Sequence, residues 1–398
     1  MQLQCQGERL SAPAIILGFG VTSLGVLRVM SRAGIPVYVV CPPGDVMTYS
    51  KWFRPLELPS INGAVPEMTL DNLAALPFSR AVLMPCSDDT ALMVANLPAH
   101  LRERFSSSIS SPEVIETLID KANLSQTLAR FDIPRPRTIL IERPSDFDVL
   151  DSWTSGRPFL KPTDSQSFFE RHGVKAVWVT DKSEALHLWL EEHMVGQQMI
   201  LQEYVPGPAD AHVLIDGFRD REGKIRALFA RRRLRMYPPD FGNSTGLVSL
   251  PLDDVRPAVE DITRLLDLLG YRGIFNVELK QDPRDGQFKL LEVNVRAWWY
   301  VEYAAWCGVD VCSLAYRDAL GLPLDDIESY DVGKRLIYPD RDMRALRDLP
   351  GVTWVDKLRW LIRLLGARQP MFMMSDPVPA VCDLARQIRG FVSRRSHR

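Results

Sequence analysis

The 398-residue sequence lacks several features that mark particular protein classes. Its six cysteines form no CxxC pair, which argues against a disulfide framework or a zinc knuckle and favours reduced thiols. None of its six histidines stands in an HExxH or similar metal-binding spacing. No window approaches the ~18 uninterrupted apolar residues of a membrane-spanning helix, and no basic and then apolar leader opens the chain. We therefore expect a cytoplasmic protein without a membrane span.

The charge is also nearly balanced. Lys and Arg number 48 and Asp and Glu 50, so the net charge of −2 gives no field that would attract nucleic acid. Any polyanion that binds this protein must therefore bind at a local site. Apolar residues make up 46% of the chain, enough for a buried core, and the length predicts about two to three packed units. No internal repeat is present.

The pattern of apolar runs changes along the chain. Residues 14–18 and 37–40 are short apolar runs separated by a helical pattern over 21–33, which predicts a β-α-β opening. Alternating runs continue to about residue 110 and predict a parallel sheet. From Pro158 onward, short β runs and one amphipathic helix indicate an α+β region. Beyond about residue 325 the chain has basic helices, for which the sequence suggests no chemistry.

A predicted hairpin carries the densest group of polar residues. Residues 274–280 and 287–294 flank Asp282–Gly286, whose proline and glycine indicate a turn. Centring the turn on Asp285 pairs Glu278 with Glu292. Strand alternation then places one set of residues on the polar face: Asn276, Glu278, Glu292, Asn294 and Arg296. The other set forms the core face: Phe275, Val277, Leu279, Leu291, Val293 and Val295.

Two directly opposed carboxylates repel each other, so this register needs a compensating cation or a bound polyphosphate complex. Two carboxylates and an amide oxygen are hard oxygen ligands that suit Mg²⁺, which takes further ligands from nucleotide phosphates. The hairpin therefore predicts nucleotide-dependent chemistry. An ordinary half-exposed hairpin, with a polar outer face and a register shifted by one residue, is the alternative.

The segment 291–296 (LEVNVR), preceded by Glu278, resembles the metal-binding signature of the ATP-grasp superfamily. The resemblance implies that Glu278, Glu292 and Asn294 bind two Mg²⁺ ions on ATP, with Mn²⁺ as an alternative metal.

Other segments extend the resemblance over most of the chain. Lys121 is similar in position to the superfamily's first ATP-contacting basic residue, and Lys161 to its second phosphate-contacting lysine. Glu203 and Val205 lie in a segment that looks like the interdomain hinge, where a carboxylate and backbone groups meet adenine. Asp210 stands where the family often has an acid that binds the ribose hydroxyls.

The basic run 231–235 precedes a MYPPDFG segment and resembles the D-aspartate-ligase-like group of carboxylate-amine ligases. The resemblance implies that Arg233 faces the triphosphate. Strand alternation separates Arg232 from its neighbours but leaves open which arginine faces the phosphates, and a solvated basic strand is the alternative. Arg296 extends the metal-bearing face and could neutralise the transferring phosphoryl group or hold a substrate carboxylate. Arg233 and Arg296 are thus the expected catalytic residues.

Several other signals are weak. The glycines of 18–23 begin like a dinucleotide fingerprint, but Ser23 replaces the third glycine and no acid follows the second strand. Residues 242–246 match a nucleophile-elbow pattern but precede a β-like run, so we expect a turn. Trp299, Tyr303 and Trp306 have helical spacing and line either the core or an acceptor pocket. Residues 163–167 lack the glycines of many phosphate-covering loops, which leaves a lid there uncertain.

We therefore expect a mixed α/β and α+β protein with an ATP-grasp fold. The expected divisions are a Rossmann-like, pre-ATP-grasp domain over 1–110, ATP-grasp subdomain A over 111–200, subdomain B with the metal hairpin over 201–325, and a C-terminal helical extension over 326–398.

The resemblance implies an ATP-dependent carboxylate-amine ligase that forms an amide through an acyl phosphate and releases ADP and phosphate. Its substrates would be a small-molecule or polymer-linked carboxylate and an amine. The alternatives are an ATP-binding sensor or assembly protein without turnover, and a ligase that uses a non-amine nucleophile. The sequence identifies neither substrate, because acceptor pockets are assembled from loops, and it leaves the oligomeric state open.

Overall fold

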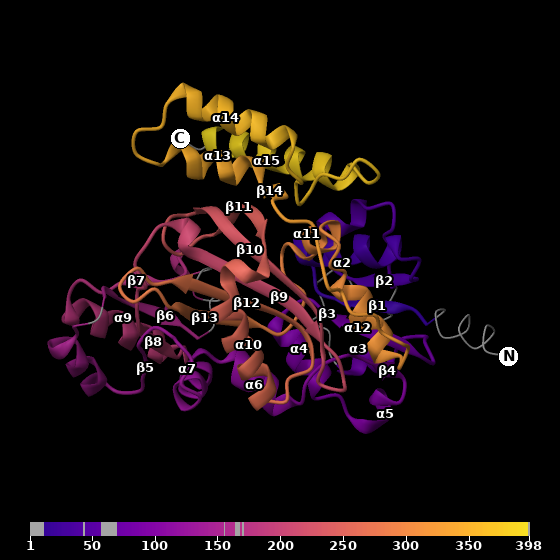
Figure 1. The fold of residues 1–398 in the computed structure, drawn as a ribbon, viewed down its shortest axis with the longest axis horizontal. Helices are drawn as coiled ribbons and strands as arrows, with labels where there is room; N and C mark the ends of the chain where they lie inside the picture. The colour runs from indigo at the N-terminus through magenta and orange to yellow at the C-terminus, as the bar shows by residue number, and fades with distance from the viewer. Residues whose placement is uncertain are drawn as a thin grey trace.

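The computed structural model describes residues 12–42, 44–56, 70–154, 156–163, 168 and 171–396, with side chains as far as residue 387. Its strands form three sheets, and three helices near the C-terminus lie above the largest of them (Figure 1). Within these residues no helix is long and apolar enough to cross a membrane.

The N-terminal sheet is parallel, as the alternating apolar runs predicted, and has the order β2-β1-β3-β4. Its central strand is buried along its whole length, which is typical of a parallel sheet covered on both faces. Its elements are β1 (Ala14–Leu17), α2 (Gly20–Arg32), β2 (Val37–Val40), η1 (Val46–Tyr49), α3 (Leu70–Ala74), β3 (Ala81–Pro85), α4 (Asp88–Ala95), α5 (Ala99–Arg102) and β4 (Phe105–Ser106).

Two helices, α6 (Pro112–Ile119) and α7 (Lys121–Arg130), lead into a small antiparallel sheet of order β5-β8-β6-β7. The elements are β5 (Thr138–Ile141), η2 (Pro144–Ser152), β6 (Pro158–Pro162), β7 (Val177–Trp178), α9 (Lys182–Met194) and β8 (Met199–Glu203). The division expected at residue 200 falls inside β8. Because β8 pairs with β5 and β6 as far as Glu203, the small sheet ends there.

The large sheet has the order β13-β12-β9-β10-β11-β14. Helix α10 packs its buried side chains against Phe275 and Val277 on one face of the sheet. The elements are η3 (Ala209–Ala211), β9 (His212–Arg219), β10 (Ile225–Tyr237), β11 (Asn243–Leu250), η4 (Leu252–Val255), α10 (Arg256–Leu268), β12 (Gly273–Gln281), β13 (Phe288–Asn294), α11 (Val301–Trp306), α12 (Val311–Ala319) and β14 (Arg335–Ile337).

The β12–β13 hairpin has the predicted register, because Glu278 lies opposite Glu292 and Asn276 opposite Asn294. One residue departs from the predicted faces. A bulge after Glu278 pairs Leu279 with Leu290, so Leu290 is buried in the core. Leu291, which we expected on the core face, instead lines a cavity on the polar side of the hairpin. An extra bulge residue shifts the alternation on its own strand only.

The segment after residue 325 is not only helical, because β14 pairs with β11 at the edge of the large sheet. Helices α13 (Pro339–Arg347), α14 (Trp354–Leu365) and α15 (Val378–Ser396) follow it. Before α15 the chain returns to the N-terminal domain. There Arg28 of α2, which is fully buried, forms ion pairs with Asp376 at 3.0 Å and with Glu302 at 3.3 Å. Asp376 also accepts hydrogen bonds from the Ser50 hydroxyl and the Lys51 backbone N–H.

Replacing Arg28 with Met should therefore lower the free energy of unfolding by about 3 to 5 kcal/mol, because it leaves the buried Asp376 carboxylate without its guanidinium. Arg32→Met is the matched control on the same helix. Its side chain is 44% exposed and lies 3.9 Å from Glu302, so we expect a loss under about 1 kcal/mol. Urea unfolding curves measure both. Equal losses for the two variants would contradict the assigned role of Arg28.

Candidate active site

A cavity of about 370 Å³ lies between the small sheet and the large sheet. Its walls come from β6 and β8 on one side, from β9 to β13 on the other, and from residues 298–300 after the hairpin. Eight of the ten residues that the sequence indicated line it: Lys161, Glu203, Val205, Arg233, Glu278, Glu292, Asn294 and Arg296. The other two, Lys121 and Asp210, do not.

Glu278 is compensated by neighbours on the adjacent strands. The Arg233 guanidinium donates to Glu278 Oε1 at 2.8 Å, and His212 Nδ1 lies 2.9 Å from the same oxygen. Burial raises the pKa of Glu278, but the charge of Arg233 and the contact with His212 outweigh it and hold the pKa well below its usual range. The carboxylate is therefore ionised at neutral pH. Burial lowers the pKa of His212, so that ring is neutral there.

Glu292 is the second carboxylate of the pair, and it is free to bind a ligand. It lines the cavity and makes no hydrogen bond or ion pair within the described part of the chain. Two lysines sense its charge electrostatically, Lys121 from α7 and Lys175 from the segment before β7. The two carboxylates therefore differ: Glu278 is held by its neighbours, and Glu292 is available.

Three lysines lie near this carboxylate pair. Lys161 and Lys175 line the cavity, whereas Lys121 lines a small crevice that shares Lys161 and Leu291 with it. Burial and the nearby positive charge of Lys161 lower the pKa of Lys121 to about 8, although Glu292 opposes the shift. Burial also lowers the pKa of Lys175. Within the described residues none of these three lysines forms an ion pair with a carboxylate, as expected of a site that receives an anion.

A hydrogen-bond network connects the hairpin to the N-terminal domain and to the neighbouring strand β9. Arg296 donates to Asp88 of α4 at 2.9 Å and to Asn294 Oδ1 at 3.1 Å. Asn294 in turn donates to Asn276 at 2.9 Å, and Asn276 donates to Asp216. The N-terminal domain therefore helps to orient Arg296, which faces the cavity from the end of the hairpin.

The arginines of β10 separate as follows. Arg231 and Arg233 line the cavity, whereas Arg235 forms an ion pair with Asp342 at 2.5 Å. Arg231 is buried and forms an ion pair with Asp216 at 2.6 Å, so its charge is largely neutralised within the protein. Arg233, which the resemblance implies faces the triphosphate, is the one that reaches the carboxylate pair. The alternation that groups these three arginines ends at a bulge between Arg233 and Arg235.

The hinge end of the cavity is aromatic. Phe159, Trp178, Tyr204 and Phe241 form a cluster with ring centroids 4.9 to 6.5 Å apart, and all but Trp178 line the cavity. Flat rings of this kind can pack against a purine base.

The acids at the hinge end do not all lie where the sequence suggested. The Glu203 carboxylate is already engaged, because it accepts from the Arg137 backbone N–H at 3.1 Å and pairs with Arg284 at 2.6 Å. Asp210 is exposed on η3 and does not line the cavity. Asp240 does line it, and accepts a hydrogen bond from the Tyr204 hydroxyl at 3.1 Å.

The structure also decides two further expectations, which concern Ser244 and Trp299 at the end of the cavity away from the hinge. Residues 243–246 are part of β11 rather than a turn, and the Ser244 hydroxyl accepts from Arg233 Nε at 2.8 Å. Ser244 therefore positions Arg233. Trp299 lines the cavity, whereas Tyr303 is buried in the core. Of the loop 163–167, residues 164–167 lie outside the described residues.

The donor set of the hairpin suits Mg²⁺. Glu292 offers both carboxylate oxygens, Glu278 offers Oε2, and Asn294 offers an amide oxygen, all on one face. No group of three or more Asp, Glu, His or Cys residues able to hold a metal occurs in the part of the chain that the structure describes, so a metal here needs the amide oxygen and ligands from phosphate.

The sequence did not indicate Lys175, His212, Asp240 or Lys280 as site residues, although all four line the cavity. Lys280 could have been found, because it stands two residues after Glu278 on the same strand face. His212 lies opposite Lys280 across the β9–β12 pair, a pairing between distant segments that one sequence does not predict. Lys175 and Asp240 lie in connections without a periodic signal.

Comparison with known proteins identifies related sequences. A family model described as "ATP-grasp in the biosynthetic pathway with Ter operon" matches residues 196–337. The chain is 25% identical over 232 residues to the D-aspartate ligase of Enterococcus faecium (strain Aus0004), a match that covers 54% of this chain and 53% of that enzyme. The chain thus spans about half the length of this curated relative.

Solved structures show the same fold. The biotin carboxylase of Campylobacter jejuni superposes with a TM-score of 0.63 at 16% identity, covering 83% of this chain and 75% of that one. The L-amino acid ligase of Bacillus licheniformis superposes with a TM-score of 0.54 at 17% identity, covering 79% and 75%. Sequence and fold therefore agree on an ATP-grasp fold, and the sequence is similar to that of a carboxylate-amine ligase-like relative.

Proposed function

We propose that the chain is an ATP-dependent carboxylate-amine ligase that forms an amide through an acyl phosphate and releases ADP and phosphate. The observation that carries the proposal is one cavity in which Lys161, Lys175, Arg233 and Arg296 surround two opposed carboxylates. Phosphoryl transfer needs mainly positioning and neutralisation of negative charge, and this arrangement offers both.

ATP would bind along the cavity, with adenine at the aromatic hinge end. Its phosphates would lie among Lys121, Lys161, Lys175 and Arg233, which are cations from other elements beside the carboxylate pair. Glu278, Glu292 and Asn294 would hold Mg²⁺. When bound, the metal neutralises charge that develops on the transferring phosphoryl group.

The two chemical steps would take place at the Arg296 end. An oxygen of the substrate carboxylate attacks the γ-phosphorus and ADP leaves, which gives an acyl phosphate. The amine nitrogen then attacks the acyl carbon, phosphate leaves, and the nitrogen loses a proton. Arg296, held by Asp88, would orient the carboxylate and balance the charge of the leaving phosphate. The amino-acid names of two relatives, D-aspartate ligase and L-amino acid ligase, support an amino acid as one substrate.

Glu292→Gln should reduce turnover at least about a hundredfold, because it removes the carboxylate of the pair that has no partner among the described residues. Fold and melting temperature should change little, since Glu292 makes no described hydrogen bond. Steady-state ADP release under saturating Mg²⁺ measures the effect.

Asp285→Asn is the matched control, an acid of the same hairpin whose partner is Lys289 at 2.6 Å, outside the cavity. It should keep near-normal turnover. Activity of Glu292→Gln close to that of this control would remove Glu292 from the metal site.

ATP affinity should fall above pH 8. In the free protein burial and Lys161 lower the pKa of Lys121 to about 8, so raising the pH through 8 removes a positive charge beside the phosphates. We expect Kd to rise by up to about tenfold between pH 8 and 9. Lys121→Arg keeps its charge in this range, so its Kd should change less. Titration calorimetry at pH 7, 8 and 9 tests this, and identical pH profiles for the two proteins would contradict it.

Hydroxylamine should replace the natural amine, because an acyl phosphate accepts a small, strong nucleophile. Incubation with ATP, Mg²⁺, hydroxylamine and pools of amino acids and other carboxylates should give a hydroxamate, whose mass identifies the acceptor. ADP and phosphate should accumulate in equal amounts with it. AMP and pyrophosphate would indicate adenylation and contradict the mechanism, and ATP that binds without turnover would favour a sensor.

A further inference from the structure

The C-terminal segment carries a net positive charge that has no part in the proposed chemistry. Residues 335–398 contain thirteen arginines and lysines but six aspartates and no glutamate, a net charge of +7 in a chain whose total is −2. The helices of this segment lie above the large sheet (Figure 1), and none of their described residues lines the cavity.

Helix α14 exposes an apolar stripe. Five large apolar side chains at spacing i, i+4, i+7, i+8 and i+11 lie on one face of the helix. Their exposed fractions are Trp354 74%, Leu358 48%, Leu361 49%, Ile362 62% and Leu365 84%. We call these five residues the α14 stripe. Single exposed apolar side chains are ordinary on a protein surface, but a contiguous row on one helix indicates an interaction site.

The stripe is not the face that packs against the protein. Trp360 on another side of the helix is buried, donates from Nε1 to Asp342 at 2.8 Å, and packs with Ile337 and Leu346. The helix is thus held in place by Trp360, and its opposite side has no described protein neighbour to cover it.

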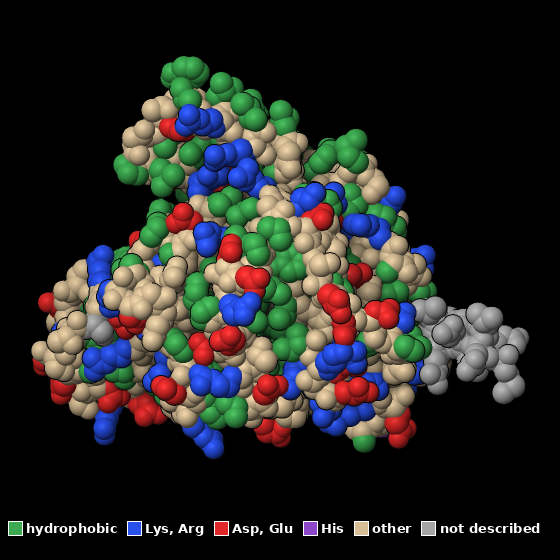
Figure 2. All heavy atoms as spheres, viewed as in Figure 1, with side chains coloured by type: hydrophobic (Ala, Val, Ile, Leu, Met, Phe, Trp, Pro, Cys, Tyr) green, Lys and Arg blue, Asp and Glu red, His purple; other side chains and the backbone are tan. Residues whose placement is uncertain are grey.

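Cations flank the stripe. Lys357 and Arg359 are exposed, and at 100° per residue Lys357 lies on one side of the stripe and Arg359 on the other, while the exposed Arg363 lies farther round the helix. The one acid of the helix, Asp356, is engaged by the Thr353 cap and lies 3.8 Å from the Arg359 guanidinium. Figure 2 shows hydrophobic side chains and blue Lys and Arg side chains together over these helices.

We propose that α14 binds the surface of an anionic membrane, lying in the plane of the interface. A helix with an apolar face that includes tryptophan, and with lysine and arginine at its borders, buries that face among the acyl chains while the cations meet anionic headgroups. With only twelve residues, α14 lies on a bilayer and does not cross it.

The charge pattern disfavours a second copy as the occupant. Symmetric pairing of two α14 stripes would bring the borders of Lys357 and Arg359 against each other, and like charges at a helix interface destabilise it. An anionic surface satisfies both the apolar stripe and its cationic borders.

Co-sedimentation with vesicles tests the proposal. The full-length protein should bind vesicles of equal parts phosphatidylcholine and phosphatidylglycerol, and bind pure phosphatidylcholine vesicles at least about tenfold more weakly. Added salt should weaken the binding. Ile362→Ser with Leu365→Ser should reduce binding at least about tenfold, since it removes two exposed members of the stripe.

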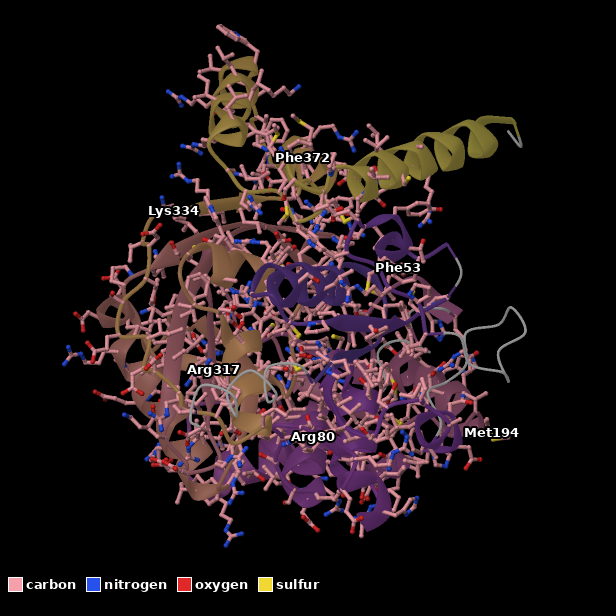
Figure 3. The ribbon with its side chains drawn as sticks, turned by 90° about the vertical axis from the view of Figure 1, so that its right-hand side faces the viewer. Phe53, Arg80, Met194, Arg317, Lys334 and Phe372 are labelled. Atoms are coloured by element: carbon pink, nitrogen blue, oxygen red, sulfur yellow. The ribbon has the colours of Figure 1, made fainter. Side chains whose placement is uncertain are left out.

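The matched control is Met194→Ser with Val195→Ser at the end of α9, whose exposed fractions of 83% and 62% match those of Leu365 and Ile362. Met194 lies away from the C-terminal helices (Figure 3), so this variant should bind like the wild type. Equal binding to both kinds of vesicle, no binding at all, or equal losses in the two variants would overturn the proposal. A dimer in sedimentation equilibrium that the Ile362 and Leu365 substitutions abolish would assign the stripe to a second copy instead.

Discussion

Two carboxylates that face each other on neighbouring strands repel each other, and the surrounding elements compensate this repulsion with positive charge. Glu278 is held by Arg233 and His212 from the next two strands, while Glu292 is left to lysines from α7 and from the segment before β7. Cations are therefore supplied by β10, by α7 and by the segment before β7. A cavity with separated charge of this kind is pre-organised for a polyanion that carries its own metal.

The same hairpin shows how far one sequence predicts a site. Turn chemistry and strand alternation determined the pairing of Glu278 with Glu292, because both depend on residues within a single short segment. Alternation was wrong for Leu291, since a bulge inserts a residue without a mark in the sequence. Local signals thus predicted the register but not its irregularity.

Residues that depend on packing between distant segments were harder to place. Asp210 was expected from the resemblance to bind the ribose hydroxyls, but it is exposed on η3, and Asp240 from another connection lines the cavity. Residues 242–246 precede a β-like run and were expected to form a turn. Pairing with β10 instead extends the strand back to include Ser244. Such assignments depend on which distant strands pair with each other, and a single sequence does not reveal that pairing.

The ion pair between Arg28 and Asp376 also has a consequence for biosynthesis. Its members are 348 residues apart, so the guanidinium of α2 lacks its buried partner until residue 376 has left the ribosome. Domains tend to fold as they emerge, with the N-terminal one first. The parallel sheet can thus form early, while the side of α2 that carries Arg28 is covered only after a much later segment has been made. A nascent chain stalled before Asp376 would expose that side to chaperones and proteases.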